Sequence, residues 1–577
     1  MDRAASTLTL LRGPATPFPC PVHDDIHSGA SDNGMRAASG IVVCLAAGVI
    51  LFWNLGGYAL WDPDEARHAE VAREMFTAAD WRGWVVPSLN FRPYYDKPVL
   101  FYWLVSGAYA LAGTSEWAAR AVSAAAALLT VLAVYLWGSY VWSRQAGIAA
   151  ALVLATGGEF VALGRYANLD MTLTLWVTLG VLGVDWWVRR VEDRAPAATV
   201  SLTGTALSAA LGMLTKGLVA PVLIGGIALA YLGVTRRLRR LSQGRLGRSA
   251  SIFVAVAGPW YLAAWFIDPD YLREFFGRHH VERFLDTTRS LRPGPIYYYI
   301  PMLILCFFPW SVLLPATIRG TLRQDRRGRP EWLCICWTLG VLVFFSLARG
   351  KLGTYILPAL PPLALLTGRY VSELVQMQEI AALERRLVAG GVMVAATVFL
   401  VAVPVLCILS LRIYGGAWVK TSLLASVMIP VGGGLVWLVR RGWHQISPIA
   451  LGAGFAMGLL IFYTWAAPSI SAVRSEAPLA AAMLRGGVAE AAAAPIVAYS
   501  VRTPSLLFYV RRPVHEIDRP RQLKSFLEKH PLVFVVTSPT HLPIVLEAGT
   551  LFPWHTGARH VLYASRPPAV TKGDQDG

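Results

Sequence analysis

The sequence predicts a mainly α-helical polytopic membrane protein that ends in a small α/β domain. Of its 577 residues, 55% are hydrophobic and 15% are charged, whereas about 25% of a typical soluble chain is charged. Apolar runs such as 37–55, 249–267 and 387–411 reach the roughly 18 residues needed to cross a bilayer. Short loops rich in lysine and arginine separate the runs. Hydropathy and loop charge together indicate about 13 transmembrane helices.

The membrane domain is predicted to cover residues 38–466, after a cytoplasmic tail at 1–37. The tail is polar, contains proline and lacks the apolar core of a signal peptide, so we expect it to be disordered. The first membrane span, at about 38–57, would then be an uncleaved anchor.

The basic residues behind the net charge of +17 concentrate in short loops such as 236–240 and 326–329. This distribution is typical of the positive-inside rule, so we expect no nucleic-acid partner. With the basic loops inside, the loops 58–117 and 268–296 lie on the outer side. The apolar run 99–113 has only roughly 15 residues, and we expect it to lie along the outer surface as a helix.

The chain from 467 to 577 also emerges on the outer side and is predicted to form the α/β domain. Strand-like apolar runs at 495–499 and 532–536 alternate with helix-like runs such as 521–529. No internal repeat is evident in the sequence.

The six cysteines indicate no disulfide framework. Cys20 lies in the tail and the other five lie in apolar segments, without paired spacing in an extramembrane region. Cys334 and Cys336 lie two residues apart inside a span, where we interpret them as packing residues rather than metal ligands.

The first outer loop is rich in charge and is predicted to begin a helix at the membrane surface. Asp62 suits the N-cap, Pro63 the first helical position and Glu65 a capping box. Asp64 would lie in the first turn, where the helix dipole favours an ionised carboxylate. Arg67, one turn further on, would pair with Asp64 or bind a phosphate. The alternative is that the acids only cap the helix.

Further charged residues of the outer side come from distant parts of the chain. Asp96 and Lys97 lie between aromatic residues, which suits an anionic lipid headgroup, although tyrosine and lysine also anchor membrane interfaces. Asp170 lies where a span meets the outer side. Lys216 interrupts an apolar run, and is either a functional residue or a side chain that reaches to the interface.

Two more groups belong to the same side. His279 and His280 supply imidazoles in the loop 268–296, and Arg349 and Lys351 place two cations outside, against the positive-inside trend. A lipid phosphate would offset such charges. The outer face as a whole therefore predicts a phosphate site beside a carboxylate, at the mouth of a membrane cavity.

In order from about residue 60 to 358, these segments resemble the GT-C membrane glycosyltransferases, specifically the bacterial family that contains lipid A aminoarabinose transferase. The C-terminal domain adds little to the resemblance. The matching pieces are WDPDEAR at 61–67, YDKP at 95–98, LD at 169–170, TKG at 215–217, the loop 269–284 and GKLGTYIL at 350–357.

The resemblance implies a polyprenyl-phosphate sugar donor, usually undecaprenyl-linked, and transfer on the periplasmic face with inversion at the anomeric carbon. It implies that Asp64 is catalytic, and we add Asp170 as a second candidate carboxylate. It also implies that Arg67, Lys97, Lys216 and Tyr355 bind or line the donor phosphate site, to which we add Arg349 and Lys351.

A divalent metal site, zinc-like and formed by Asp96 and His280, is also implied by the resemblance. The family favours glutamate at position 96, tyrosine at 68 and proline at 353, where this chain has Asp96, His68 and Gly353. The shorter side chain of Asp96 would weaken or move the metal site. No glycine-rich phosphate loop is present in the sequence, so we expect no nucleotide cofactor.

The predicted function is that of a monomeric inner-membrane glycosyltransferase whose active site faces the periplasm. It would move a sugar such as 4-amino-4-deoxy-L-arabinose from undecaprenyl phosphate to lipid A or another envelope glycan or protein. Two alternatives stay open at this point: a protein O-mannosyltransferase-like enzyme, and a transporter or flippase of an anionic polyprenyl lipid. The sequence indicates no inverted repeat and no paired broken helices, which disfavours the transporter.

Overall fold

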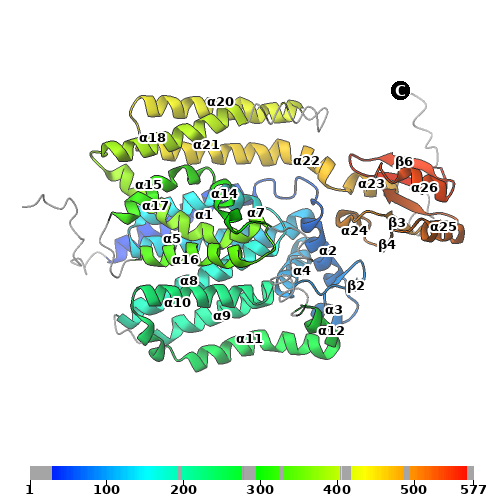
Figure 1. The fold of residues 1–577 in the computed structure, drawn as a ribbon, viewed down its shortest axis with the longest axis horizontal. Helices are drawn as coiled ribbons and strands as arrows, with labels where there is room; N and C mark the ends of the chain where they lie inside the picture. The colour runs from blue at the N-terminus through cyan, green and yellow to red at the C-terminus, as the bar shows by residue number, and fades with distance from the viewer. Residues whose placement is uncertain are drawn as a thin grey trace, which may run out of the picture.

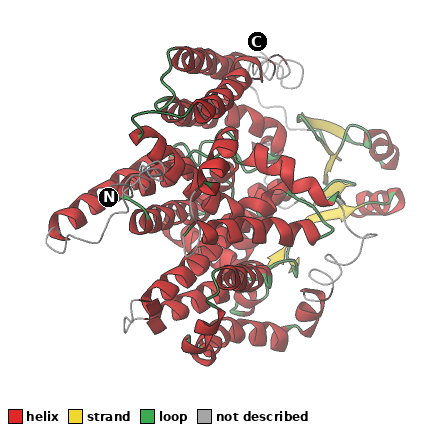
Figure 2. Ribbon diagram, turned by 60° about the vertical axis from the view of Figure 1, so that its left-hand side comes forward, coloured by secondary structure: helices red, strands yellow, loops and turns green. Residues whose placement is uncertain are grey.

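The computed structural model describes residues 29–192, 198–275, 277, 294–323, 330–402, 405, 408, 418–485 and 494–567. Most of them form helices that lie side by side, and a small sheet domain lies at one end of this helical body (Figure 1). Figure 2 shows the strands gathered on one side of the molecule. The predicted fold class, a helical membrane protein with a small C-terminal α/β domain, is confirmed.

Five helices of the described part are long and apolar enough to cross a membrane. Two bent helix pairs also satisfy this criterion when each pair is taken as one span, which gives up to seven. The five are α1 (Gly29–Phe52), α5 (Glu116–Val141), α8 (Leu169–Glu192), α11 (Leu246–Ile267) and the run Ser447–Arg474, which contains α21 (Ser447–Ile461) and α22 (Ala467–Arg474).

The two bent pairs correct the expectation that the chain has no paired broken helices. The first pair, α6 (Arg144–Ala155) and α7 (Gly158–Gly164), bends by 67°, and the second, Ile296–Cys306 with Trp310–Leu322, bends by 104°. The breaks touch, because the backbone N–H of Gly158 donates to the carbonyl of Phe308 at 2.8 Å. Hydropathy does not detect such breaks, because the residues on both sides of each one are apolar.

Shorter helices complete the helical body. With the five long helices and the two bent pairs they would account for the predicted number of about 13 crossings, but they do not meet the criterion of length and hydropathy used above. The number of crossings therefore stays a prediction. These helices are α9 (Ala198–Lys216), α10 (Val219–Val234), α16 (Glu331–Leu347), α17 (Leu360–Gln376), α18 (Ala382–Thr397) and α20 (Trp418–Arg440).

The first helix differs from its predicted bounds of about 38–57. It begins at Gly29, inside the predicted tail, and ends at Phe52. Its most apolar part runs from Gly34 to Phe52, because hydropathy marks only the apolar part of a helix and not the polar turns that precede it. The rest of the predicted tail, residues 1–28, lies outside the described residues.

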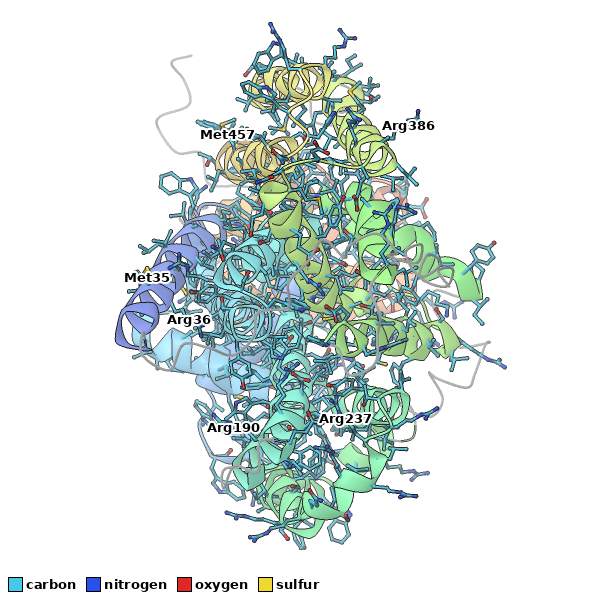
Figure 3. The ribbon with its side chains drawn as sticks, turned by 90° about the vertical axis from the view of Figure 1, so that its left-hand side faces the viewer. Met35, Arg36, Arg190, Arg237, Arg386 and Met457 are labelled. Carbon is cyan, nitrogen blue, oxygen red and sulfur yellow. The ribbon has the colours of Figure 1, made fainter. Side chains whose placement is uncertain are left out.

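The end of the helical body opposite the sheet domain carries basic residues. Figure 3 looks onto this end, where Arg36, Arg190, Arg237 and Arg386 are labelled. Arg237 forms an ion pair of 2.9 Å with Glu192 at the end of α8. Basic loops at one end and the sheet domain at the other agree with the predicted orientation of the chain.

The first outer segment folds into short helices and a hairpin beside the sheet domain. Its third helix, α4, has 13 residues, fewer than the roughly 20 needed to cross a bilayer, which agrees with the predicted surface helix at 99–113. It packs against the first helix of the segment and against α5. The elements are α2 (Asp64–Phe76), α3 (Arg82–Val85), an antiparallel hairpin of β1 (Ser88–Leu89) and β2 (Arg92–Pro93), and α4 (Leu100–Ala112).

The C-terminal domain is built on a five-stranded sheet with strand order β4-β3-β5-β7-β6. Strand β3 pairs in parallel with β4 and β5, whereas β7 is antiparallel to β5 and β6. The strands predicted at 495–499 and 532–536 and the helix predicted at 521–529 are confirmed. The elements are α23 (Ala477–Arg485), β3 (Ile496–Tyr499), α24 (Pro504–Val510), β4 (Val514–Ile517), α25 (Pro520–Lys529), β5 (Phe534–Thr537), α26 (Leu542–Ala548), β6 (Phe552–Thr556) and β7 (Val561–Ala564).

Polar contacts hold this domain against the first outer segment. The buried carboxylate of Asp62 accepts hydrogen bonds from the backbone N–H of Ser505, at 2.8 Å, and from its hydroxyl. The hydroxyl of Tyr509 accepts from the backbone of Leu60 at 3.0 Å and donates to Glu116 at 2.9 Å. The domain is therefore fixed directly beside the start of α2.

Candidate functional site

The N-terminus of α2 presents Asp64 and Arg67 together at the outer end of the helical body. The two side chains form an ion pair of 3.0 Å and are 50% and 28% exposed, respectively. The predicted pairing of Arg67 with Asp64 is therefore confirmed. The predicted cap is wrong: Pro63 is the N-cap residue, and the side chain of Asp62 turns to Ser505 instead.

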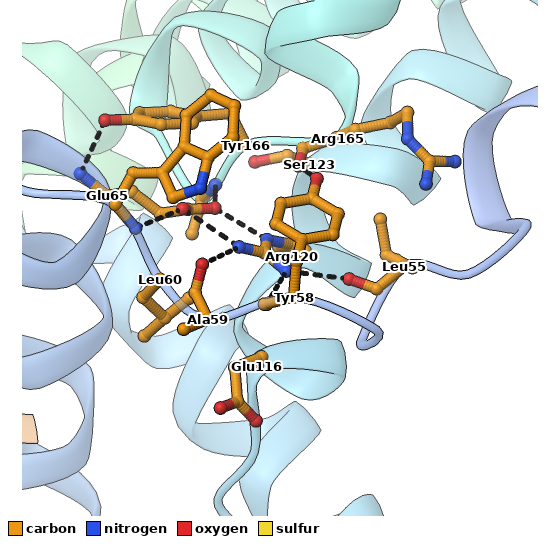
Figure 4. Close-up of polar contacts among 12 residues, drawn as sticks. Leu55, Tyr58, Ala59, Leu60, Glu65, Glu116, Arg120, Ser123, Arg165 and Tyr166 are labelled. Atoms are coloured by element: carbon orange, nitrogen blue, oxygen red, sulfur yellow. Dashed lines mark hydrogen bonds and ion pairs between the residues drawn. The ribbon is translucent and has the colours of Figure 1, made fainter. Parts of the chain in front are cut away.

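A buried ion pair fixes the start of α2. The guanidinium of Arg120 on α5 is fully buried and donates to both carboxylate oxygens of Glu65, at 2.7 and 3.0 Å (Figure 4). The carboxylate of Glu65 also accepts from the backbone N–H groups of Trp61, at 2.8 Å, and Ala167, at 3.2 Å. Arg120 further donates to the carbonyls of residues 55, 58 and 59.

Sequence reasoning missed Arg120. A signal for it was present, because it is the one arginine within the apolar helix α5, and an ionisable residue inside such a helix needs a partner. The partner was not evident, because Glu65 lies 55 positions earlier in the chain.

A second ion pair joins two helices that come from later in the chain. Asp170, in the first turn of α8, pairs with Lys216, the last residue of α9. The two side chains are 15% and 13% exposed. The ammonium group of Lys216 also lies 4.6 Å from the centre of the Tyr355 ring. The structure thus brings together three of the predicted site residues from three separate segments.

Charged side chains of the first outer segment lie near the pair of Asp170 and Lys216, since the charge of Asp96 acts on Lys216. Lys97 pairs with Asp96 at 3.4 Å, and the hydroxyl of Tyr94 donates to Asp96 at 3.1 Å. The buried imidazole of His68 contacts the hydroxyl of Tyr102 at 3.1 Å, and the charges of Asp96 and Lys97 act on it.

His68 responds to cations from two parts of the site, the first outer segment (Arg67 and Lys97) and the end of α9 (Lys216). Burial is the largest cause that holds the pKa of His68 well below its usual value, and the charges of Arg67, Lys97 and Lys216 lower the pKa further. The imidazole therefore stays neutral at pH 7. Three predicted phosphate-binding cations, Arg67, Lys97 and Lys216, therefore lie near enough to His68 for their charges to act on one imidazole.

Lys351 and Arg349, two predicted phosphate ligands, lie on the segment that follows α16. The ammonium group of Lys351 donates to the carbonyls of Phe345, Ser346 and Ala348, at 3.1, 2.6 and 2.6 Å. Its three N–H groups therefore satisfy the C-terminal end of α16, and its role as a phosphate ligand stays a prediction. Arg349 is exposed, and no described contact connects it with the site.

The predicted metal site is represented only by Asp96. His280 lies outside the described residues. Within the described ranges no group of three histidine, cysteine, aspartate or glutamate side chains is placed to hold a metal ion. Both oxygens of Asp96 already face donors, since one lies near Lys97 and the other accepts from Tyr94. The described residues therefore do not fit a metal centre by themselves.

Solved structures with the same fold include membrane glycosyltransferases. The crystal structure of ArnT from Cupriavidus metallidurans bound to undecaprenyl phosphate matches with a TM-score of 0.76 at 23% identity, over 93% of this chain and 99% of that one. The archaeal oligosaccharyltransferase AglB from Archaeoglobus fulgidus matches with a TM-score of 0.52 at 12% identity, over 94% of this chain and 75% of that one. Both matches establish the fold alone.

Sequence comparison identifies the family. A family model described as dolichyl-phosphate-mannose-protein mannosyltransferase matches residues 96–261. The undecaprenyl phosphate-alpha-4-amino-4-deoxy-L-arabinose arabinosyl transferase of Pseudomonas aeruginosa (strain UCBPP-PA14) is 36% identical over 57% of this chain and 58% of its own length. The corresponding transferase 1 of Pseudomonas fluorescens (strain Pf0-1) is 32% identical over 433 residues, which cover 74% of this chain and 72% of that protein. The chain therefore belongs to the family of undecaprenyl phosphate-aminoarabinose arabinosyl transferases, which are membrane glycosyltransferases of the GT-C fold.

Proposed function

We propose that this chain moves 4-amino-4-deoxy-L-arabinose from undecaprenyl phosphate to lipid A, on the periplasmic face of a bacterial inner membrane. Its family membership supports the reaction class. The observation that carries the proposal is the group of paired charges at the outer end of the helical body. There Asp64 with Arg67, and Asp170 with Lys216, lie beside the pair of Asp96 and Lys97.

The cations of this group would hold the phosphate of the donor. Arg67, Lys97 and Lys216 are placed to stabilise the negative charge that develops on the phosphate as it leaves. A phosphate is a good leaving group, so the reaction needs no strong acid to protonate it. In this proposal Asp170 positions the ammonium of Lys216, with which it pairs.

Asp64 would act on the acceptor. In the proposed step an acceptor oxygen attacks the anomeric carbon, and the bond from that carbon to the phosphate oxygen breaks. The electron pair leaves with undecaprenyl phosphate, and the acceptor proton goes to the carboxylate of Asp64. The half-exposed position of Asp64 leaves room for an acceptor, and orientation of the attacking group contributes along with proton transfer. A divalent metal held by Asp96 and His280 stays a prediction.

Mass spectrometry of lipid A from cells that express this chain tests the proposal. We expect an aminopentose increment with the intact chain and none with Asp64→Asn. The variant should reach the membrane in normal amounts, because the Asp64 side chain is half exposed. Asp80→Asn is the matched control, since Asp80 is an exposed acid of the same outer segment, and the increment should persist in it.

The other outcomes separate the alternatives. Transfer by the Asp64→Asn variant would contradict the role of Asp64. If the donor is consumed but lipid A is unchanged, the acceptor is another envelope glycan or a protein. If the donor crosses the membrane without loss of its sugar, the chain is a transporter and the proposal fails.

A further inference from the structure

A pocket of about 360 Å³ lies between the first outer segment and the C-terminal domain. A volume of this order is typical of sites for small ligands and headgroups. The outer segment contributes residues from the start of α2 and from the hairpin, and the domain contributes residues from β3, β4 and the loop before α24. The polar residues of its lining include Arg67, Asn90, Arg92, Tyr94, Arg502 and Glu516.

The walls of the pocket are held in place by hydrogen bonds. The side chain of Asn90 donates to the carbonyl of Val514 at 2.7 Å and accepts from the backbone N–H of Val514 at 2.9 Å, which fixes the hairpin against β4. The carboxylate of Glu74 on α2 accepts from the hydroxyl of Ser88, at 2.6 Å, and from the backbone N–H of Phe91, at 3.0 Å. The hairpin is therefore anchored on both sides, and Arg92 is placed beside the pocket by a fixed backbone.

The lining of the pocket has more guanidinium groups than carboxylates, while Arg67 and Arg502 also pair with Asp64 and Asp518, which do not line it. It contains three guanidinium groups and one carboxylate. Arg502 pairs with Glu516 at 3.2 Å and with Asp518 at 3.3 Å, while its side chain is 56% exposed. Arg92 is exposed and forms no ion pair with another described residue. Such a lining favours an anion, and a phosphate in particular, because a guanidinium group forms bidentate hydrogen bonds with a phosphate.

The pocket lies next to Asp64 and is separate from most of the proposed donor site. Pro63 and Arg67, which stand on either side of Asp64 in the sequence, both line it. Lys97, Lys216 and Tyr355 are not among its lining residues. Arg67 is thus common to two groups of cations, one toward the membrane helices and one toward the C-terminal domain. A transferase that moves a sugar from one lipid to another must hold both headgroups close to the catalytic carboxylate.

We propose that this pocket receives the phosphate-bearing headgroup of the acceptor lipid and that Arg92 and Arg502 contact it. The C-terminal domain then takes part in acceptor selection. This inference rests on the proposed function and names the site of its second substrate. The donor lipid also carries a phosphate, so the experiment must separate the two lipids.

The test uses the full chain in nanodiscs with undecaprenyl-phosphate-linked aminoarabinose and bisphosphorylated lipid A. We expect Arg92→Gln and Arg502→Gln each to raise the KM for lipid A about tenfold, with the KM for the donor and the slow hydrolysis of the donor by water unchanged. Arg521→Gln is the matched control, because Arg521 is exposed on the same domain outside the pocket. All three side chains are exposed, so the variants should fold normally.

Each outcome decides the proposal. A rise in the KM for the donor would assign the pocket to the donor and overturn the inference, and so would unchanged values for both lipids. Absence of donor turnover in the intact chain would instead refute the proposed function. In that case, binding of bisphosphorylated against dephosphorylated lipid A, measured without donor, still tests the pocket: the intact chain should favour the phosphorylated form about tenfold or more, and equal binding would overturn the inference.

Discussion

At the scale of single residues, the positive charges of the site already have carboxylate partners. Arg67 pairs with Asp64 at 3.0 Å and Lys97 pairs with Asp96 at 3.4 Å. A lone charge beside the hydrocarbon layer is costly, so such pairing is expected before the donor binds. Under the proposed function, a donor phosphate at Arg67 would compete with Asp64 for the guanidinium. Donor binding would then weaken the hold of Arg67 on the Asp64 carboxylate and leave that carboxylate more available to the acceptor.

Replacement of Lys351 distinguishes two roles of this side chain, that of a helix cap and that of a phosphate ligand. Lys351→Met removes the charged donor from three carbonyls at the end of α16, at a cost of about 1–3 kcal/mol. We expect a lower Tm in detergent and an unchanged KM for the donor. Arg349→Met is the control, because Arg349 is exposed and two residues away, and its Tm should stay constant. A raised KM for the donor at constant Tm in Lys351→Met would show that Lys351 binds the donor phosphate.

The same residues show what the sequence could predict about the site. Asp64, Arg67, Asp170 and Lys216 stand out because each interrupts an apolar pattern or follows it on the outer side, whereas Tyr355 was predicted from the family resemblance alone. The structure brings each of the five into a contact with another member of the group. The contacts of Lys351 could not be predicted, because they depend on where α16 ends and not on the pattern of charge.

At the scale of elements, α2 owes its position to α5. A first turn held by a fully buried ion pair keeps Asp64 in one place relative to the helical body. The sequence predicted a helix start here from local capping rules. It could not predict that Asp62 would leave the cap position, because Asp62 finds its partner Ser505 at a separation of 443 positions.

Replacement of Glu65 tests this positioning. Glu65→Gln leaves the buried guanidinium of Arg120 without a charged partner, and we expect a loss of about 3–5 kcal/mol in stability together with a lower kcat. Replacing both residues by methionine removes the lone charge, so part of the Tm should return. The kcat should stay low, because the carbonyls at 55, 58 and 59 lose their donor. Full recovery of kcat in the double variant would show that the pair supports only stability.

At the scale of the whole molecule, the contact between Asp62 and Ser505 links the C-terminal domain to the membrane domain. The interface between the two domains closes one side of the proposed acceptor pocket. A weaker interface is therefore expected to weaken acceptor binding. Burial raises the pKa of Asp62 from 3.8 to about 6, against the lowering effect of the hydrogen bonds from Ser505, and Glu476 raises it further. Glu476 itself contacts the imidazole of His560 at 2.6 Å, within the C-terminal domain.

The raised pKa of Asp62 predicts that docking of the domain weakens as the pH rises. The docked state holds the proton more tightly than the undocked state, so docking loses stability between about pH 4 and pH 6 and changes little above that range. From pH 5 to pH 7 the docking equilibrium should fall about tenfold. Hydrogen exchange or limited proteolysis of residues 477–567 at these two pH values measures it. In Asp62→Asn this dependence should largely vanish, while Asp518→Asn, an exposed acid of the same domain, should keep it. If Asp62→Asn shows the full dependence, the pH effect does not come from Asp62, which then serves docking only as a hydrogen-bond acceptor.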